Sequence, residues 1–317
     1  MLHKVRTHHK HSEGKIFAWM SLILALGVSL INPILSPFVH SIIKNESQVS
    51  LFFAFLGIMT LIAALASGLI FKKIDRTAIT KSGFIIFALT YFLLVFVTEL
   101  IPLTILLTVK AWLQMILLIT IGLFVRDFAK AKKLGNEEGL HYRYQNIGIF
   151  TGLLFGGFLA TNFDYEFVFI VASSVLIFAF VYFYRKHTIE QHPAIINQKK
   201  ISQYSLGHNV KEFFSNKERA KAYIMTVGLM LWFGFKYLYV PLYILRSGYL
   251  DSMSGLVLAV SILPLIFFEV KVGNYADRQG MHKPIAFGFL IIAITNLIIF
   301  FNPLHLVNFF LIACVNL

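Results

Sequence analysis

Residues Gly273–Lys283 read GNYADRQGMHK and lie between two long apolar stretches. The segment combines glycines with Asp, Arg, His and Lys, whose charged side chains are costly to place in a hydrocarbon core. A less regular copy, SGLIFKKIDRTAITK, covers Ser67–Lys81 near the start of the chain. Each copy has an Asp-Arg pair after an apolar stretch long enough to cross a bilayer. The pattern therefore predicts membrane-spanning segments joined by charged loops, with one loop type used twice.

The composition places the chain in a lipid bilayer. Hydrophobic residues make up 58% of its 317 residues, charged residues only 14%, and the mean hydropathy is +0.75. This is more apolar surface than one soluble core can hide. The net charge of +13 does not indicate a nucleic-acid partner, because the basic residues lie between apolar spans and not on one soluble face. The single Cys314 excludes an intrachain disulfide.

Apolar windows near the length of a spanning helix recur along the whole chain. The first window is predicted to be a retained helix and not a signal peptide, because it contains Asn32, Pro33 and Pro37 and no small-residue cleavage site. The sequence thus predicts an all-α polytopic membrane protein with about ten helices. The windows are 16–40, 51–71, 82–99, 101–125, 145–163, 167–184, 222–246, 253–272, 284–301 and 304–317.

The positions of Lys and Arg predict the orientation. With the N-terminus in the cytoplasm, 24 of the 28 Lys and Arg residues fall in cytoplasmic segments. Cytoplasmic loops carry such an excess of basic residues in membrane proteins. We therefore expect a multi-pass protein of the cell (plasma or inner) membrane with a cytoplasmic N-terminus.

A long polar segment divides the chain into two halves, and the Asp-Arg loops follow the second helix of each half. Parallel repeats of this kind occur in many transporters. By this symmetry the second half lacks two helices, so we expect a chain truncated at its C-terminus; a true ten-helix protein is the alternative. The predicted divisions are a basic tail (1–15), a six-helix bundle (16–185), a cytoplasmic linker (186–221) and a four-helix bundle (222–317).

Three motifs resemble the major facilitator superfamily, over nearly the whole chain. The loop Gly273-x-x-x-Asp277-Arg278-x-Gly280-x-x-Lys283 resembles its signature loop; the first copy keeps Asp75, Arg76 and Lys81 but has Phe71 and Ala78 where glycines are usual. Gly148, Gly152, Gly156 and Gly157 resemble the glycine motif of its antiporter branches, although Leu153 stands where a proline is typical. Gly27, Pro33 and Pro37 are similar to the first helix of its drug exporters. The resemblance implies a fold of six plus six helices and secondary transport.

The Asp-Arg loops are predicted to form a conformational latch on the cytoplasmic side. The Asp277 carboxylate can accept hydrogen bonds from free N–H groups at a helix start in the other half, near Arg143. The resemblance adds an acidic relay residue at the end of helix four, a position matched by Asp127. Ordinary positive-inside loop residues are the alternative. The predicted latch residues are Gly273, Asp277, Arg278, Gly280, Lys283, Asp75, Arg76, Asp127, Arg143 and Glu269.

Glycines at fourfold spacing place a stripe without side chains on helix five. Gly148, Gly152 and Gly156, with Gly157 beside them, let a neighbouring backbone approach closely. We predict a sliding contact between the two halves. A static, tightly packed helix pair is the alternative.

Two lysines inside spans predict a substrate cavity. Lys110 and Gln114 lie one helical turn apart on helix four, and Lys236 lies near the middle of helix seven. The resemblance implies that these helices line the central cavity, where the lysines would attract an anionic or carboxylate-bearing substrate; snorkelling to the membrane surface is the alternative. Asn32, Trp112, Trp232 and Tyr237 are further lining candidates, unless the aromatic residues only pack.

The sequence favours a secondary active transporter of a small organic solute, with ion-gradient-driven efflux as in drug exporters. The coupling ion is expected to be a proton, which Glu269 could bind, although its position favours the latch. No G-x-x-x-x-G-K-[ST] loop for ATP is present, and we predict no cofactor, no metal site and a monomer. An uptake permease for an anionic metabolite or sugar is the alternative. A polytopic enzyme or a non-transporting scaffold explains the lysines and the repeat less well.

Overall fold

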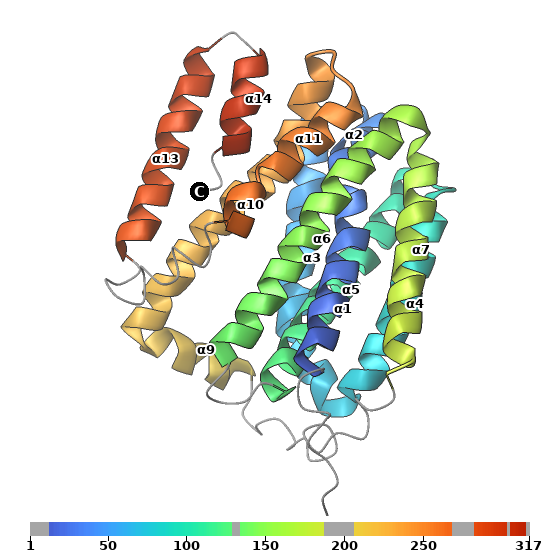
Figure 1. Ribbon diagram of the computed structural model, residues 1–317, viewed down its shortest axis with the longest axis vertical. Coiled ribbons are helices and arrows are strands. Elements are labelled where there is room, and N and C mark those ends of the chain that lie inside the picture. Colours follow the sequence, from blue (N-terminus) through green and yellow to red (C-terminus); the bar gives the residue numbers. More distant parts are fainter. Residues whose placement is uncertain (1–12, 129–133, 187–205, 268–281, 303–304, 315–317) are drawn as a thin grey trace, which may run out of the picture.

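The computed structural model describes residues 13–128, 134–186, 206–267, 282–302 and 305–314 (Figure 1). All regular elements in these ranges are helical, as the sequence predicts. Residues up to 186 form seven helices: α1 (Glu13–Leu30), α2 (Asn32–Ile43), α3 (Glu46–Lys73), α4 (Arg76–Leu94), α5 (Leu100–Phe128), α6 (Leu134–Asn162) and α7 (Tyr165–Tyr184). The helices that follow are α9 (Leu206–Ser215), α10 (Lys217–Arg246), α11 (Asp251–Val260), α13 (His282–Phe301) and α14 (His305–Cys314).

Each of the ten apolar windows overlaps a helix, but not every helix has the properties of a span. Seven described helices are long and apolar enough to cross a membrane; α1 and α2 count together as one span, Lys15–Ile43. The helix α6 has 29 residues but carries polar residues in its first half and many glycines in its second. The helices α11 and α14 have 10 residues each. The chain is a multi-pass membrane protein.

Proline and turn chemistry explain where the first spans break and turn. Helix α1 ends before Ile31, and Pro33, which has no backbone N–H, lies in the first turn of α2. Lys44 ends α2 in the left-handed region (φ 59°) and its N–H bonds to the His40 carbonyl at 2.8 Å. The Asn45 side chain then caps α3 by accepting a hydrogen bond from the Gln48 N–H.

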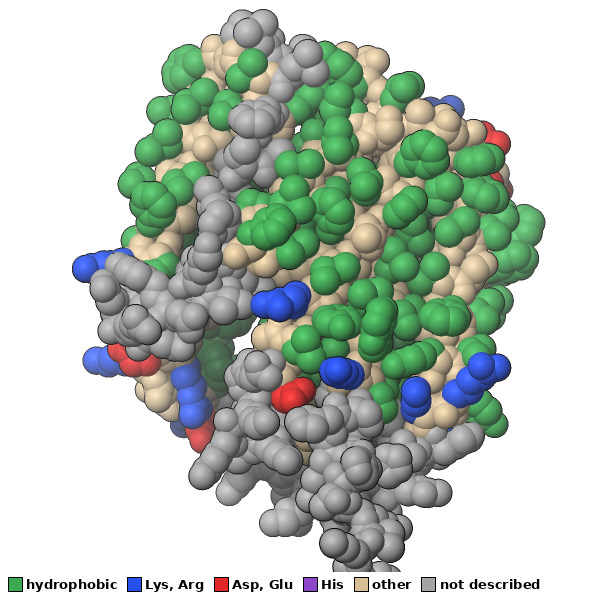
Figure 2. All heavy atoms as spheres, viewed as in Figure 1, with side chains coloured by type: hydrophobic (Ala, Val, Ile, Leu, Met, Phe, Trp, Pro, Cys, Tyr) green, Lys and Arg blue, Asp and Glu red, His purple; other side chains and the backbone are tan. Residues whose placement is uncertain are grey.

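The bundle has two ends with different character. We call the end with the start of α1 and the α3–α4 turn the basic end, at the bottom of Figure 1, and the end with the α2–α3 and α6–α7 turns the opposite end. Figure 2 shows hydrophobic side chains over the middle of one face and Lys and Arg side chains mostly toward the basic end. A wide apolar band is what a lipid-facing surface requires.

Two hydrophobic cores hold the helices together. The first lies among α1–α5 and α7, includes Leu238 and Leu242 of α10, and contains fully buried rings such as Phe17 and Phe84. The second joins α10, α11 and α14 and also includes Leu153 of α6. Helix α6 therefore belongs to the packing of both halves, and it positions them relative to each other.

Candidate functional site

Two apolar helical segments, the first span and the shorter segment Asp251–Phe267, are interrupted along their length. The first span breaks at Ile31, and α11 gives way to a turn at Ser261 and Ile262, before Pro264. Helices that break inside a membrane leave backbone groups free, and transporters use such breaks at their binding sites. Asn32 lies at the first break with a half-buried side chain that makes no hydrogen bond within the described residues.

Lys236 lies beside the second break. It is fully buried, with 0% exposure, and its ammonium donates a hydrogen bond to Ser261 Oγ at 3.1 Å. The same Nζ lies 4.8 Å from the centre of the Phe233 ring and 5.1 Å from that of Tyr237. No carboxylate in the described ranges pairs with it. A buried ammonium held by one hydroxyl and two ring faces retains capacity for an anion.

The other predicted cavity residues are more dispersed. Lys110 and Gln114 are half-buried on α5 and have no hydrogen bond or ion pair to any described residue. Trp232 is buried one turn before Lys236 and stacks beside Phe235. Since the recorded polar and ring contacts of Lys236 are all within the second half, the structure does not bring it into contact with Lys110.

The glycine stripe of α6 packs mainly within the first half. A Cβ added to Gly148, Gly152 or Gly156 would lie 2.3, 2.7 or 1.9 Å from the carbonyl oxygens of Leu22, Leu26 and Leu30, respectively, all on α1. The predicted contact between the halves is therefore wrong for these three glycines. They form a tight pair of helices, α1 and α6, as the alternative prediction states.

Gly157 alone faces the second half. Its added Cβ would lie 2.8 Å from the Cα of Gly255 on α11, and a Cβ on Gly255 would lie 2.5 Å from the Leu153 carbonyl. The two backbones therefore cross where neither has a side chain. Of the four predicted glycines, Gly157 is the one that contacts the second half, and sliding at this contact stays a prediction.

Polar contacts between the halves accompany this crossing near the opposite end. The Ser252 N–H donates to Thr161 Oγ1 at 2.7 Å, and the Tyr165 hydroxyl donates to Asp251 Oδ2 at 3.3 Å. Two further contacts join α3 to α10: Ser50 Oγ with Tyr239 OH at 3.0 Å, and Glu46 with Arg246 at 3.1 Å. We call these four contacts and the Gly157–Gly255 crossing the seam.

The burial of α10 agrees with the location of the seam. Its buried residues Val240, Pro241, Leu242 and Ile244 lie toward the opposite end, whereas Tyr223, Ile224, Met230 and Leu231, toward the basic end, are 43 to 70% exposed. Among the described residues, the contacts between the halves thus lie toward the opposite end of the bundle.

The predicted latch lies partly outside the described residues. Gly273, Asp277, Arg278, Gly280 and Glu269 belong to that part, whereas Lys283 is exposed at the start of α13. Asp75 precedes α4 without capping it through its side chain, and Arg143 is exposed on α6. Arg76 pairs with Asp127 at the end of α5, and Arg126 pairs with Glu138 at 2.9 Å. Both of these ion pairs lie within the first half.

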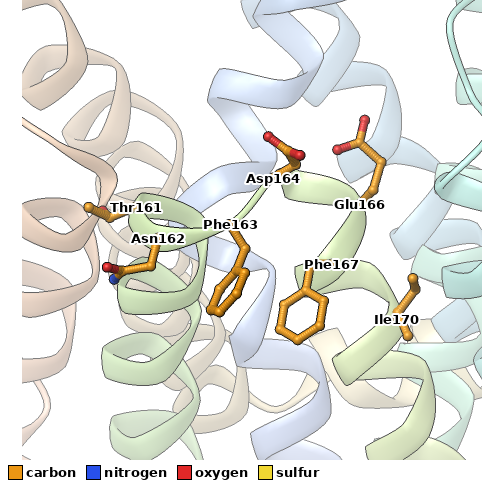
Figure 3. Close-up of a pocket in the computed structure, with 7 residues that line it drawn as sticks. All are labelled: Thr161, Asn162, Phe163, Asp164, Glu166, Phe167 and Ile170. Atoms are coloured by element: carbon orange, nitrogen blue, oxygen red, sulfur yellow. The ribbon is translucent and has the colours of Figure 1, made fainter.

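A surface hollow lies away from these residues. A volume of about 530 Å³ is lined by residues of the α6–α7 turn, including Asp164, Glu166 and Phe167, and by none of the predicted cavity residues. In Figure 3 the two carboxylates point away from the rings of Phe163 and Phe167. This surface hollow at the opposite end is separate from the breaks at Ile31 and Ser261.

Sequence reasoning missed several partners. Ser261 is a hydroxyl residue three positions before a proline within a span, which is a signal for a helix break. Ser254-Gly255 is a small pair in an apolar helix, which is a signal for close packing. His141, buried on α6 and 2.5 Å from Ser21 Oγ, gave no signal beyond its polarity inside the bundle.

Comparison with known proteins identifies the family of this architecture. The model described as Major Facilitator Superfamily matches residues 17–316, and a search of curated proteins found no match. The nucleoside transporter NupG superposes with a TM-score of 0.70 and 13% identity, over 96% of this chain and 77% of that one. A bacterial homologue of the human lysosomal transporter Spinster superposes with a TM-score of 0.68 and 13% identity, over 98% of this chain and 73% of that one. A D-xylose-proton symporter superposes with a TM-score of 0.66 and 12% identity, over 96% of this chain and 79% of that one.

Proposed function

The chain belongs to the Major Facilitator Superfamily, and from this we propose that it moves a small organic solute across the membrane by alternating access. Family and neighbours indicate a transporter, not an enzyme. The observation that carries the mechanism is the seam, which joins the halves at the opposite end while the basic-end half of α10 stays exposed. Opening the seam while the basic end closes would expose the middle of the bundle to the other side.

We place the solute between the two interrupted helical segments, near Asn32 and Lys236. Support comes from two polar groups inside the bundle that are not fully paired: the half-buried Asn32 amide, and the buried Lys236 ammonium with one hydroxyl partner. Polar groups inside a membrane are costly and are functional hypotheses by default. Lys110 and Gln114 on α5 have no polar partner among the described residues. We propose that they line the same solute site from the first half.

The direction we propose is efflux driven by an ion gradient, with a proton as the coupling ion and the basic end in the cytoplasm. The distribution of Lys and Arg supports the orientation. The second candidate is uptake of an anionic metabolite, and one observation favours the anionic solute that it requires: Lys236 is a buried cation without a carboxylate partner in the described ranges. A cationic solute would be repelled from it.

Flux in sealed vesicles tests the proposal. Purified protein in liposomes is given a panel of radiolabelled anionic, neutral and cationic metabolites and drugs, with a pH gradient in either direction or none. Accumulation that depends on the gradient supports secondary transport, and its direction separates efflux from uptake. Protein-free liposomes are the control. Lack of protein-dependent flux for the whole panel in both directions would count against the proposal.

The latch is a separate proposal with its own variant. Asp277→Asn removes the charge that would bind the start of a helix in the other half and should lower flux at least tenfold while leaving insertion intact. Asp164→Asn, an exposed carboxylate at the opposite end, is the matched control. Wild-type flux in Asp277→Asn would remove Asp277 from the mechanism.

A further inference from the structure

Helix α9 presents an apolar side that the described part of the protein leaves partly exposed. Val210, Phe213 and Phe214 follow the spacing that places residues on one side of a helix. They are 41%, 39% and 48% exposed. Exposed apolar residues clustered on a short helix mark an interaction surface.

The aromatic residues connect this side to the next helix. The rings of Phe213 and Phe214 lie 6.2 and 5.2 Å from that of Tyr223, near the start of α10, and Tyr223 is itself 43% exposed. The Asn216 side chain accepts hydrogen bonds from the N–H groups of Glu218 and Arg219. Rings and cap together fix the elbow between α9 and α10.

The elbow has to lie at the membrane surface. Helix α10 is a membrane span, and Tyr223 is only about 9 Å along it from Lys217 at 1.5 Å per residue. Aromatic side chains at the end of a span favour the headgroup level. Since α9 runs crosswise below α10 at the basic end (Figure 1), its apolar side lies at the same level.

The charged residues of the elbow indicate what kind of partner this surface binds. Glu218 pairs with Lys221 at 2.9 Å, and Glu212 lies 3.8 Å from His208, which carries a charge only when it is protonated. Lys211, Lys217 and Arg219 are exposed and have no carboxylate partner in the described ranges. The elbow therefore combines inserted aromatic rings with uncompensated positive charge.

We propose that α9 and the first two turns of α10 form a docking surface for anionic phospholipids. Phe213, Phe214 and Tyr223 enter the boundary between headgroups and acyl chains, and Lys211, Lys217 and Arg219 contact the phosphates. A lipid leaflet fits better than a protein partner because the surface continues directly into a span that the bilayer already surrounds. This inference depends on the membrane-spanning fold and not on transport.

Spin-label depth measurements test this surface. A label is attached through Val210→Cys, with the native thiol removed by Cys314→Ser, and the full chain is placed in nanodiscs of phosphatidylcholine with or without phosphatidylglycerol. We expect greater oxygen access and lower access of a water-soluble nickel complex when phosphatidylglycerol is present. Lys211→Gln with Lys217→Gln should reduce this bound population about fivefold for each residue removed, as for one charge near an anionic surface.

Lys44→Gln with Lys73→Gln removes two exposed charges outside the elbow and should leave the label depth unchanged. Equal depth in both lipids would overturn the preference for anionic headgroups. A label in water in both lipids would overturn the docking itself. A label shielded from oxygen and nickel alike would assign the surface to a protein contact, either with a second copy or with another segment of the chain.

Discussion

Arg246 Nε lies 3.1 Å from the Glu46 carboxylate and joins the end of α10 to the start of α3. The side chains are 71% and 48% exposed, so this ion pair contributes at most about 1 kcal/mol. We predict that Glu46→Gln favours opening of the seam modestly. With a thiol introduced by Ser254→Cys, which replaces a side chain buried near Gly255, the labelling rate should rise up to about fivefold.

The exchanged pair, Glu46→Arg with Arg246→Glu, is the control for this effect. It reverses both charges and should return the labelling rate of the thiol at position 254 to that of the parent. High salt should act like Glu46→Gln, because exposed charges are screened. A rate that the neutralisation does not change would show that the ion pair does not hold the seam closed.

Gly156→Ala should be the most damaging change in the glycine stripe. Its Cβ would lie 1.9 Å from the Leu30 carbonyl, a backbone atom that can move only if α1 and α6 separate. Overpacking of this kind costs about 1–3 kcal/mol. We expect a lower melting temperature and a lower yield of monodisperse protein in detergent.

Gly122→Ala is the matched control for Gly156→Ala. Nothing lies within 4 Å of a Cβ at Gly122, and alanine is favoured over glycine inside a helix by roughly 0.5–1 kcal/mol. Its melting temperature should be equal to or above that of the parent. If both variants melt alike, the close approach of α1 and α6 is not required for stability.

Gly157→Ala should act on the contact between the halves. The added Cβ would meet the backbone of α11 at 2.7 to 2.9 Å, while the α1–α6 contact stays as it is. We predict a melting temperature closer to that of the parent than for Gly156→Ala, but faster labelling of the Ser254→Cys thiol. A Gly157→Ala variant with parental labelling would contradict the assignment of Gly157 to the seam.

The sequence could predict the helices because spans need only length and apolarity. All ten windows overlap helices, and the Asp-Arg loops and glycine spacing were sufficient for the family. The sequence could not predict which helix each glycine packs against. Gly156 and Gly157 are adjacent, yet Gly156 faces α1 and Gly157 faces α11. The helical repeat gives the direction in which a residue points from the axis of its helix. It does not say which other helix lies in that direction.

Long-range polar partners were also beyond the sequence. Glu46 and Arg246 are 200 positions apart and each resembles an ordinary charged residue at the end of a span. Lys236 could be recognised because a lysine in an apolar span is rare, but Ser261 could not be identified as its partner. Such pairs depend on how the spans are arranged, which hydropathy does not encode.

Ser261→Ala should destabilise the buried Lys236 ammonium by removing its hydrogen-bond partner, while the charge stays in place. The ammonium loses its only recorded hydrogen-bond acceptor, and an unsatisfied buried group costs about 1–3 kcal/mol, or more when charged. We expect a lower melting temperature for Ser261→Ala than for Lys236→Met, which removes the charge together with its need for a partner. The double variant should melt near Lys236→Met, so the two changes are not additive.

Arg76 and Asp127 provide the last prediction, at the basic end. The Arg76 side chain is only 11% exposed and pairs with Asp127, which is 31% exposed, so the guanidinium depends on this carboxylate more than a surface pair would. Asp127→Asn should lower the melting temperature by removing about 1–3 kcal/mol of stability. Arg76→Gln with Asp127→Asn should recover part of that loss, because no buried charge then remains unpaired. A double variant less stable than Asp127→Asn alone would show that Arg76 contributes through its packing between α4 and α5 and not through the ion pair.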